Sequence, residues 1–408
     1  MKDNEKTSKN LNWYLAQPIE TQLELFKHYT EIAKLIANQV FEEEVAEKAG
    51  KRYERETQRY NRWGSNPGSI RIGEERVKMF IPRLYDKSTG KTESLENYKK
   101  LRATELPSEL LLKKILYGLS ENNYGEVAKM TAESFGLSQS SISRAFVEES
   151  EKVLKEFESR DLSSYDFVGL VIDGKYLQKE QVVIALGITI SGDKLPLGFI
   201  HSTTENSESI GELLKDLIRR DFKFTDGLLV ITDGSTGLIK GIKKTFGKYA
   251  ISQRCTWHKR ENVVSYLPKE IQDHYRGKLQ RAYLEPEYAT AKIMLNEILD
   301  ELKEINRSAA KSLTEGLAET LTLHRLGLVE QLGKSLLTTN VIESLNSQLG
   351  NYLRKVRHWS SSNMRARWIA TSLIQIEKRM RKINNYKKLN LLRTAIKSEL
   401  KLKQNKVA

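Results

Sequence analysis

Two aspartates follow apolar runs of the kind that form buried strands. The run 167–172 leads into Asp173-Gly174, and the run 227–232 leads into Asp233-Gly234 sixty residues later. When two such carboxylates lie close together they repel each other, and a divalent cation relieves the repulsion. Carboxylate ligands, and a need to bind the oxygens of a phosphate, favour Mg²⁺ as this cation, and Mn²⁺ can substitute for it. Two such ions can activate an attacking water or 3′-hydroxyl and stabilise a leaving 3′-oxygen.

Each aspartate also has a simpler interpretation, because Asp-Gly is among the commonest turn dipeptides. The occurrence of two, both after buried runs that one sheet would bring together, favours the metal site. A third acidic ligand is expected from a helix packed across the sheet, and Glu343 is the candidate. Asn340 and Glu343 also have the spacing of a helix capping box with Asn340 as the N-cap, a role that is compatible with metal binding.

A C-x-x-H pair, Cys255 and His258, lies between the second aspartate and Glu343. A structural zinc site needs four ligands, and a chain with one cysteine and six dispersed histidines is a poor source of them. We therefore expect the pair to lie at the end of the fifth strand of the sheet, beside the acidic residues. There His258 would contact a phosphate or shape the site, and a plain packing role is the alternative.

The order of the predicted strands is what brings the two aspartates together. After the first strand the pattern predicts a hairpin of two strands at 181–190 and 195–203. It then predicts a helix at 207–221, the fourth strand at 227–233, a helix at 236–247 and the fifth strand at 249–255. Three antiparallel strands followed by α/β crossovers predict a ribonuclease-H-like mixed sheet, in which the first strand is central and the fourth lies beside it. A doubly wound dinucleotide-binding fold would alternate from its start and carry a glycine-rich first turn, which the sequence lacks.

The segments around this sheet are mostly helical. About 75 residues after Cys255 have helical patterns. A further helix carries Glu343 on one face and an apolar stripe on another, formed by Ile342, Leu345, Leu349 and Leu353. The predicted fold is therefore α/β, with the sheet interrupted by an all-helical insertion.

The N-terminal part has a different pattern. Residues 11–50 are expected to form helix that stops at Gly50. Residues 61–73 are rich in turn-forming types, and 76–85 alternate like a strand, which Pro82 makes short or confines to a sheet edge.

A helix-turn-helix is predicted within 124–157, after a helix at 106–120. The turn lies at Gly136, and Ser138 caps the second helix. The side chains that would point outward early in that helix are of types that reach bases or phosphates: Gln139, Ser140, Ser141 and Arg144. An ordinary helical hairpin with a solvated polar face is the alternative, and the basic composition of the chain favours DNA.

The charge of the chain is concentrated at one end. The 408 residues carry a net charge of +14, and residues 351–408 contain 16 lysines and arginines against two acids, so the remainder is neutral as a sum. Such a segment predicts a polyanionic partner, nucleic acid before membrane, with a solvated basic face as the alternative. The first cations of the segment are expected to contact phosphates: Arg354, Lys355 and Arg357.

Compartment signals are few. One cysteine allows no intramolecular disulfide, which fits a reducing compartment. The first residues lack an apolar signal-peptide core and no run approaches 18 apolar residues, so we expect neither a signal peptide nor a membrane span.

Taken together, "LLVITDGSTGLIKGIKKTF", "QRCTWHKRENV", "TTNVIESLN" and the region "WGSNPGSIRIGEERVKMFIPR" resemble the Mutator-type bacterial insertion-sequence transposases. The resemblance implies a ribonuclease-H-like DDE core, interrupted after the fifth strand by an all-helical insertion. It implies that Asp173, Asp233 and Glu343 form the metal-binding triad. Cys255 and His258 match the family's C-x-x-H, and Asn340 matches the Asn before the catalytic Glu.

Two positions near these motifs stand apart. Ser344 and Ser347 occur where relatives often have arginine, so DNA contacts at this helix are expected to differ. Trp257, inside the C-x-x-H, is interpreted as a core aromatic, with stacking on a flipped base as the alternative.

The expected activity is that of a DNA transposase with Mg²⁺, two ions in number, as cofactor. It would bind terminal inverted repeats and target DNA as a homo-oligomer, at least a dimer, in the bacterial cytoplasm at the nucleoid, with no membrane partner. Two DNA-binding regions are expected first: a DNA-end-binding region at 1–100, helical with a short β segment, and a helix-turn-helix region at 101–160. The first part of the core follows at 161–260, the helical insertion at 261–334, the second part of the core at 335–385 and the basic tail at 386–408. A non-catalytic helix-turn-helix regulator and a ribonuclease-H-like nuclease or resolvase are the competing hypotheses.

Overall fold

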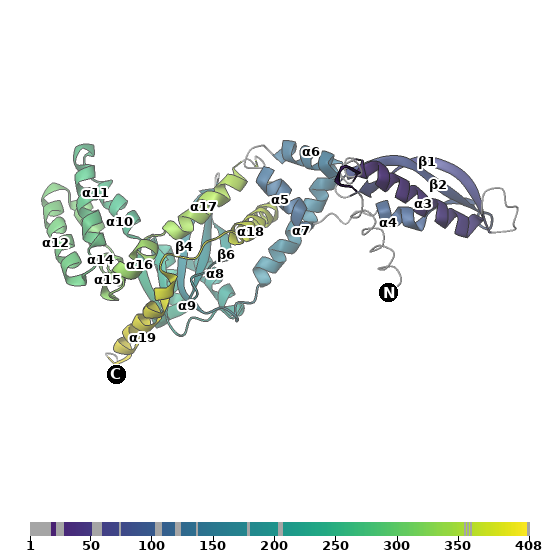
Figure 1. Cartoon of the computed structure of the whole chain (residues 1–408). Coiled ribbons are helices and arrows are strands. Elements are labelled where there is room, and N and C mark those ends of the chain that lie inside the picture. The colour runs from purple at the N-terminus through teal and green to yellow at the C-terminus, as the bar shows by residue number, and fades with distance from the viewer. Residues whose placement is uncertain are drawn as a thin grey trace. The chain divides into compact units, whose positions relative to one another are not determined.

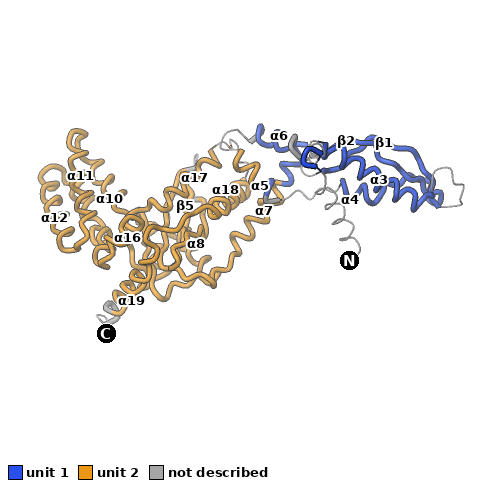
Figure 2. The backbone as a smooth tube through the Cα atoms, in the orientation of Figure 1, with its two compact units in different colours: residues 1–111, 125–145 blue, residues 112–124, 146–408 orange. Residues whose placement is uncertain are grey.

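Two units make up the chain in the computed structural model (Figures 1 and 2). The first comprises residues 1–111 and 125–145, and the second comprises 112–124 and 146–408. Within them the structure describes residues 18–21, 28–50, 59–72, 75–102, 108–118, 124–135, 138–177, 180–202, 207–354, 356, 359 and 361–405.

The first unit is built on a three-stranded antiparallel sheet, in the order β1 (Tyr60–Ile72), β2 (Glu75–Asp86) and β3 (Lys91–Ser94). Helices α3 (Tyr29–Ala49) and α4 (Glu96–Arg102) pack on the sheet, and Phe41 lies at the centre of their shared core. The helix α3 ends at Gly50, as predicted, because this glycine takes a φ of 74° and its N–H closes the last turn on Ala46 O.

Two expectations for this unit were wrong. The turn-rich segment 61–73 forms most of β1, and β2 is the central strand although it contains Pro82. The proline is tolerated because the ladder is already interrupted on both sides. Its partner in β1 is Ser65, which follows a bulge, and β3 pairs only from Arg83 onward.

The helices α5 (Ser108–Gly118), α6 (Tyr124–Phe135) and α7 (Gln139–Ser159) follow in the chain. The predicted cap at the start of α7 is confirmed, because Ser138 Oγ accepts a hydrogen bond of 3.1 Å from Ser141 N. Gly136, the expected turn residue, lies outside the described residues.

A five-stranded mixed sheet forms the centre of the second unit, in the order β6-β5-β4-β7-β8. Its strands are β4 (Phe167–Leu177), β5 (Glu180–Thr189), β6 (Lys194–Ser202), β7 (Leu228–Thr232) and β8 (Ala250–Arg254). The first three are antiparallel, whereas β7 runs parallel to β4 and β8 parallel to β7. The predicted strand sequence and the predicted β4–β7 neighbourhood are therefore both confirmed.

Both faces of the central strand β4 are covered, which explains its continuous apolar run. Leu170 and Ile172 lie in a core with residues of α8 (Ser207–Arg219) and α9 (Thr236–Phe246). Because side chains alternate along a strand, Val171 and Asp173 point to the opposite face. On that face α17 (Asn340–Leu353) packs against β4.

Residues 255–339, all of them described, form helices and turns. They comprise α10 (Thr256–Val264), α11 (Lys269–Leu284), α12 (Tyr288–Ile305), α13 (Arg307–Thr314), α14 (Leu317–Thr320), α15 (Thr322–Arg325) and α16 (Val329–Leu336). Much of this segment has a hydrophobic core of its own, which contains Leu279, Leu295 and Leu302. The helices α17, α18 (Ser362–Glu377) and α19 (Leu389–Asn405) follow, and the predicted stripe of α17 is buried throughout.

A buried lysine ties α10 to the end of α13. Lys259 has no exposed surface, and its Nζ donates hydrogen bonds of 2.5 Å to the carbonyl oxygens of Ser312 and Glu315. These oxygens lie at the C-terminal end of α13, where the helix dipole favours a positive charge. Burial nevertheless lowers the pKa of Lys259 to about 8.

Replacing Lys259 with methionine is expected to lower the free energy of unfolding by about 2–3 kcal/mol, since two buried carbonyls lose their donor. The free energy of unfolding of the wild type should also rise with pH between about 8, the pKa of Lys259 in the folded chain, and 10.5, the ordinary pKa of lysine. In this range the unfolded chain still binds a proton that the folded chain has released, so raising the pH favours the folded state. Denaturant unfolding at several pH values measures both effects.

The matched control is Lys303→Met, which changes an exposed lysine paired with Asp300 and should shift stability by less than about 0.5 kcal/mol. Equal stability of the Lys259 and Lys303 variants, or the same rise with pH in Lys259→Met as in the wild type, would contradict the role given to the buried amine.

Candidate active site

Asp173 lies inside β4 rather than at its end, so the turn interpretation of Asp173-Gly174 is wrong. Pairing with β5 continues through Asp173↔Ile184 as far as Leu177↔Glu180. The parallel pairing with β7 stops earlier, at Val171↔Ile231. Asp173 therefore lies just beyond the end of the β4–β7 pairing, where β4 is still paired with β5. Its side chain is buried, with 7% of the residue exposed.

Asp233 directly follows β7, as predicted. The last β4–β7 pair is Val171↔Ile231, so Asp173 and Asp233 each lie two residues beyond it, at the same end of two neighbouring strands. Asp233 Oδ1 accepts a hydrogen bond of 2.8 Å from Ser235 N, and its carbonyl oxygen lies 3.3 Å from the Nε of Arg254, which donates to it. The strand end, the turn and the arginine together fix the backbone at this aspartate.

Glu343 lies in the first turn of α17, the helix that packs on β4. Its Oε1 accepts a hydrogen bond of 2.9 Å from Thr339 Oγ1 and lies 3.5 Å from Nε2 of His258. One turn further along the helix, Asn346 Nδ2 donates to Asp173 Oδ2 at 3.0 Å. Lys175 of β4 donates to the carbonyl oxygen of Asn346 at 3.0 Å. The α17 backbone is thus held across the part of β4 that carries Asp173.

Cys255 links the ends of two strands to the helix that carries Glu343. Its N–H donates to Thr232 O at 2.8 Å, beside Asp233, and its sulfur lies 3.4 Å from both N and Oγ1 of Thr339. Burial raises the pKa of the Cys255 thiol, which keeps the sulfur protonated. The Thr339 hydroxyl has a single proton, and the nearer Glu343 carboxylate is its stronger acceptor.

The capping-box interpretation was wrong in detail. The N-cap of α17 is Thr339, and Asn340 is the first helical residue, exposed to solvent. Glu343 reaches back to the hydroxyl of Thr339 instead of the backbone of Asn340.

The acidic side chains are each engaged by the protein: Asp173 by Asn346, Asp233 by its own turn and Glu343 by Thr339. In the described part of the chain, no group of three or more His, Cys, Asp or Glu side chains is arranged to hold a metal ion as it stands. The structure shows one candidate acid within β4, one directly after β7 and one in the first turn of α17.

Asn346 was missed as a site residue. It is buried, and its Oδ1 makes no hydrogen bond to any described residue. The signal in the sequence was its spacing of three residues from Glu343, which places both side chains on one helix face.

The residues expected to contact DNA lie at several places. On α7, Gln139, Ser140 and Arg144 are exposed and Ser141 is half-buried, and Gln139 Nε2 donates to Gly125 O at 3.2 Å. Arg354 is exposed at the end of α17. Lys355 and Arg357 lie outside the described residues.

Part of the basic C-terminal segment is a packed helix. Leu392 and Ile396 of α19 are fully buried. Arg393 is paired with Asp166, and Lys397 lies 3.1 Å from Asp226. These cations are already neutralised, so only some of the charge in this segment is available to phosphates.

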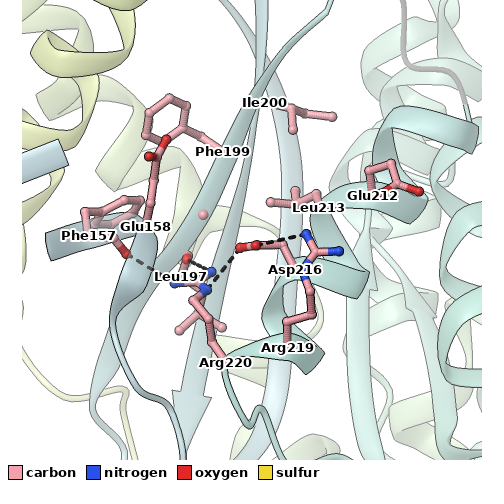
Figure 3. Close-up of a pocket in the computed structure, with 11 residues that line it drawn as sticks. Phe157, Glu158, Leu197, Phe199, Ile200, Glu212, Leu213, Asp216, Arg219 and Arg220 are labelled. Atoms are coloured by element: carbon pink, nitrogen blue, oxygen red, sulfur yellow. Dashed lines mark hydrogen bonds and ion pairs between the residues drawn. The ribbon is translucent and has the colours of Figure 1, made fainter. Parts of the chain in front are cut away.

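A pocket of about 350 Å³ lies beside β6 (Figure 3), and none of the three candidate acids is among its lining residues. Its buried Arg220 donates to the carbonyl oxygens of Phe157 and Leu197 and forms an ion pair of 3.0 Å with Asp216. Burial raises the pKa of Glu158 in the same lining. The polar groups of this pocket join α7, β6 and α8, which is a structural role.

Comparison with known proteins shows where this arrangement belongs. Residues 5–381 match the family described as Transposase, Mutator family.

The chain belongs to this family of transposases.

Among its relatives is the transposase of insertion sequence element IS6120 from Mycolicibacterium smegmatis, 29% identical over 244 residues, which cover 58% of this chain and 74% of the relative. Another is the transposase of IS256 in transposon Tn4001 from Staphylococcus aureus, 25% identical over 363 residues, 85% of this chain and 89% of the relative. Mutator-family transposases are in general enzymes that cut and join DNA. None of the described helices is long and apolar enough to cross a membrane.

Proposed function

We propose that the chain is a catalytically competent insertion-sequence transposase, which cuts DNA at the ends of its element and joins the freed 3′-hydroxyls to target DNA. The observation that carries the proposal is the packing of α17 on β4, in which the helix of Glu343 is hydrogen-bonded to Asp173 through Asn346. Asp233 follows directly after β7, the strand that pairs with β4. The sheet order, three antiparallel strands followed by two parallel ones, supports a ribonuclease-H-like core.

The residues present fit a hard divalent cation. The donors on β4, β7 and α17 are carboxylate oxygens, which Mg²⁺ and Mn²⁺ prefer. Beside Asp173, the buried Oδ1 of Asn346 is an acceptor that no described group satisfies. Asp173, Asp233 and Glu343 would hold the cofactor, two ions in our proposal, which would supply Lewis acidity and an activated water.

The protein's own contribution is positioning. Asn346 fixes the orientation of Asp173, and Thr339 fixes that of Glu343. His258 lies next to Glu343 and within reach of a phosphate near it. The exposed polar residues of α7 and Arg354 would bind terminal inverted repeats and flanking phosphates, with at least two copies of the chain on paired ends.

The test uses the full chain with duplexes that carry the inverted repeats flanking its coding region. With Mg²⁺ we expect nicks at the element end and joining of a pre-cut 3′ end to target DNA, and neither product with EDTA. Sequence-specific binding without nicks in Mg²⁺ or Mn²⁺ would favour a regulator. Nicks without joining of pre-cut ends would favour a nuclease or resolvase.

Asn346→Ala is expected to raise the Mg²⁺ concentration needed for half-maximal cleavage about 10- to 100-fold, since Asp173 loses the donor that orients it. A magnesium titration of the cleavage rate measures this shift. The control is Ser347→Ala, at an exposed position of the same helix. A lower maximal rate with an unchanged magnesium midpoint would contradict the positioning role.

A further inference from the structure

Trp257 is not a core residue, because 42% of its surface is exposed. It lies at the start of α10, and its ring meets the His258 ring edge to face, with the centroids 4.8 Å apart and the planes at 85°. His258 in turn lies 3.5 Å from Glu343. An exposed indole is therefore separated from a candidate catalytic carboxylate by one side chain.

The indole lines a pocket of about 250 Å³ formed by α10, α11, α16 and the start of α17. This volume is below the roughly 300–1,000 Å³ of sites for whole drug-sized ligands, and it suits one planar ring system. The exposed Leu284 adds apolar surface to the aromatic face of Trp257. No aspartate or glutamate is among the described residues that line the pocket.

The polar groups of the lining are suited to the edge of a nucleobase and its phosphate. Gln280 Oε1 already accepts from Arg260 at 2.9 Å, so its amide nitrogen is the end that can donate to a ligand. Asn340 offers both a donor and an acceptor, and it is exposed. Arg260 is paired with Glu261, whereas Lys334 is an exposed cation at the rim.

We propose that this pocket binds one unpaired DNA base next to the scissile phosphate, stacked on Trp257, with Gln280 and Asn340 at its edge and Lys334 near the adjoining phosphate. The inference rests on the proposed function and deepens it. A protein that takes a base out of a duplex to stack it on an aromatic ring must first unstack and unpair that base, and this costs less for a mismatched base than for a paired one. A mismatch at the right position should therefore tighten binding.

The experiment measures binding in EDTA, so that no cleavage occurs. Fluorescence anisotropy would compare duplexes of the element end that are identical except for a single mismatch, moved in turn through each position around the cleavage site. We expect the wild type to prefer the mismatch at one position near the scissile phosphate. Trp257→Ala should bind that duplex about 5- to 100-fold more weakly and lose the preference, as stacking energies predict.

Trp257→Phe is the matched variant and should keep most of the preference, because it retains an aromatic face. Gln280→Ala, at an exposed position, should reduce the preference without disturbing the fold. The proposal is overturned if the wild type binds all the mismatched duplexes equally well. It is also overturned if Trp257→Ala lowers the affinity for every duplex by the same factor. Because the assay needs no metal, a protein that prefers the mismatch but never nicks DNA with Mg²⁺ would refute the proposed activity and leave the base pocket standing.

Discussion

Asp173→Asn is expected to reduce Mg²⁺-dependent cleavage by roughly 10³-fold or more, with DNA affinity within about twofold of the wild type. Asparagine has the same shape, and its amide oxygen can still accept the hydrogen bond from Asn346. What is lost is the negative charge that would hold a cation at the end of the β4–β7 pairing. End-labelled duplex measures cleavage, and anisotropy measures binding.

Asp233→Asn and Glu343→Gln should have effects of similar size, and the double variants should be little worse than the single ones, since the three acids would act as a unit. The control is Asp221→Asn. Asp221 is exposed and has a φ of 62°, a conformation that asparagine tolerates well. Cleavage by Asp173→Asn at the wild-type rate would remove this aspartate from the mechanism.

Gly234→Ala is expected to destabilise the fold by about 2–4 kcal/mol and to abolish cleavage. Gly234 has a φ of 92°, which is strained for any residue with a Cβ. A Cβ there would lie 2.0 Å from Nε of Arg254 and 2.5 Å from its Cζ. Arg254 is buried and also donates to Glu315 O, so it cannot move aside without releasing its bond to Asp233 O. Denaturant unfolding and the cleavage assay measure the two losses.

Gly211→Ala is the matched control for the glycine substitution. Gly211 lies in α8, and a Cβ added there meets no atom within 4 Å. Helix propensity then predicts a gain of about 0.5–1 kcal/mol and unchanged cleavage. If Gly234→Ala unfolds at the same denaturant concentration as the wild type, the close approach of Arg254 to the turn does not constrain this site.

The central sheet could be predicted because its signals are local. The apolar runs of β4, β5 and β7 have the length of strands, and the helices between them have clear amphipathic patterns. The sheet of the first unit was missed for the opposite reason. Gly64, Pro67 and Gly68 indicate turns by local chemistry, yet β1 holds them in a strand through its pairing with β2. That pairing is a tertiary effect which no local pattern contains.

The candidate site also has a part that local sequence signals predict and a part that depends on tertiary contacts. Acidic residues after apolar runs are visible in the sequence, and so is the alternative of a turn. The decision between them at Asp173 depends on β5 continuing past the point where β7 stops, which is a property of two partner strands. The contact of Asn346 with Asp173 joins residues 173 positions apart. The role of Cys255 likewise depends on Thr339, 84 positions later.

The packing of α19 has a consequence for synthesis on the ribosome. Arg393 hydrogen-bonds to the carbonyl oxygen of Phe167, 226 positions earlier, and Ile396 lies against Gly227 at the start of β7. At about 5–20 residues per second, α19 emerges roughly 10–45 s after the strand it covers. Until then the start of β4 and the residue before β7 lack this packing partner. The central sheet therefore completes its packing only late in translation.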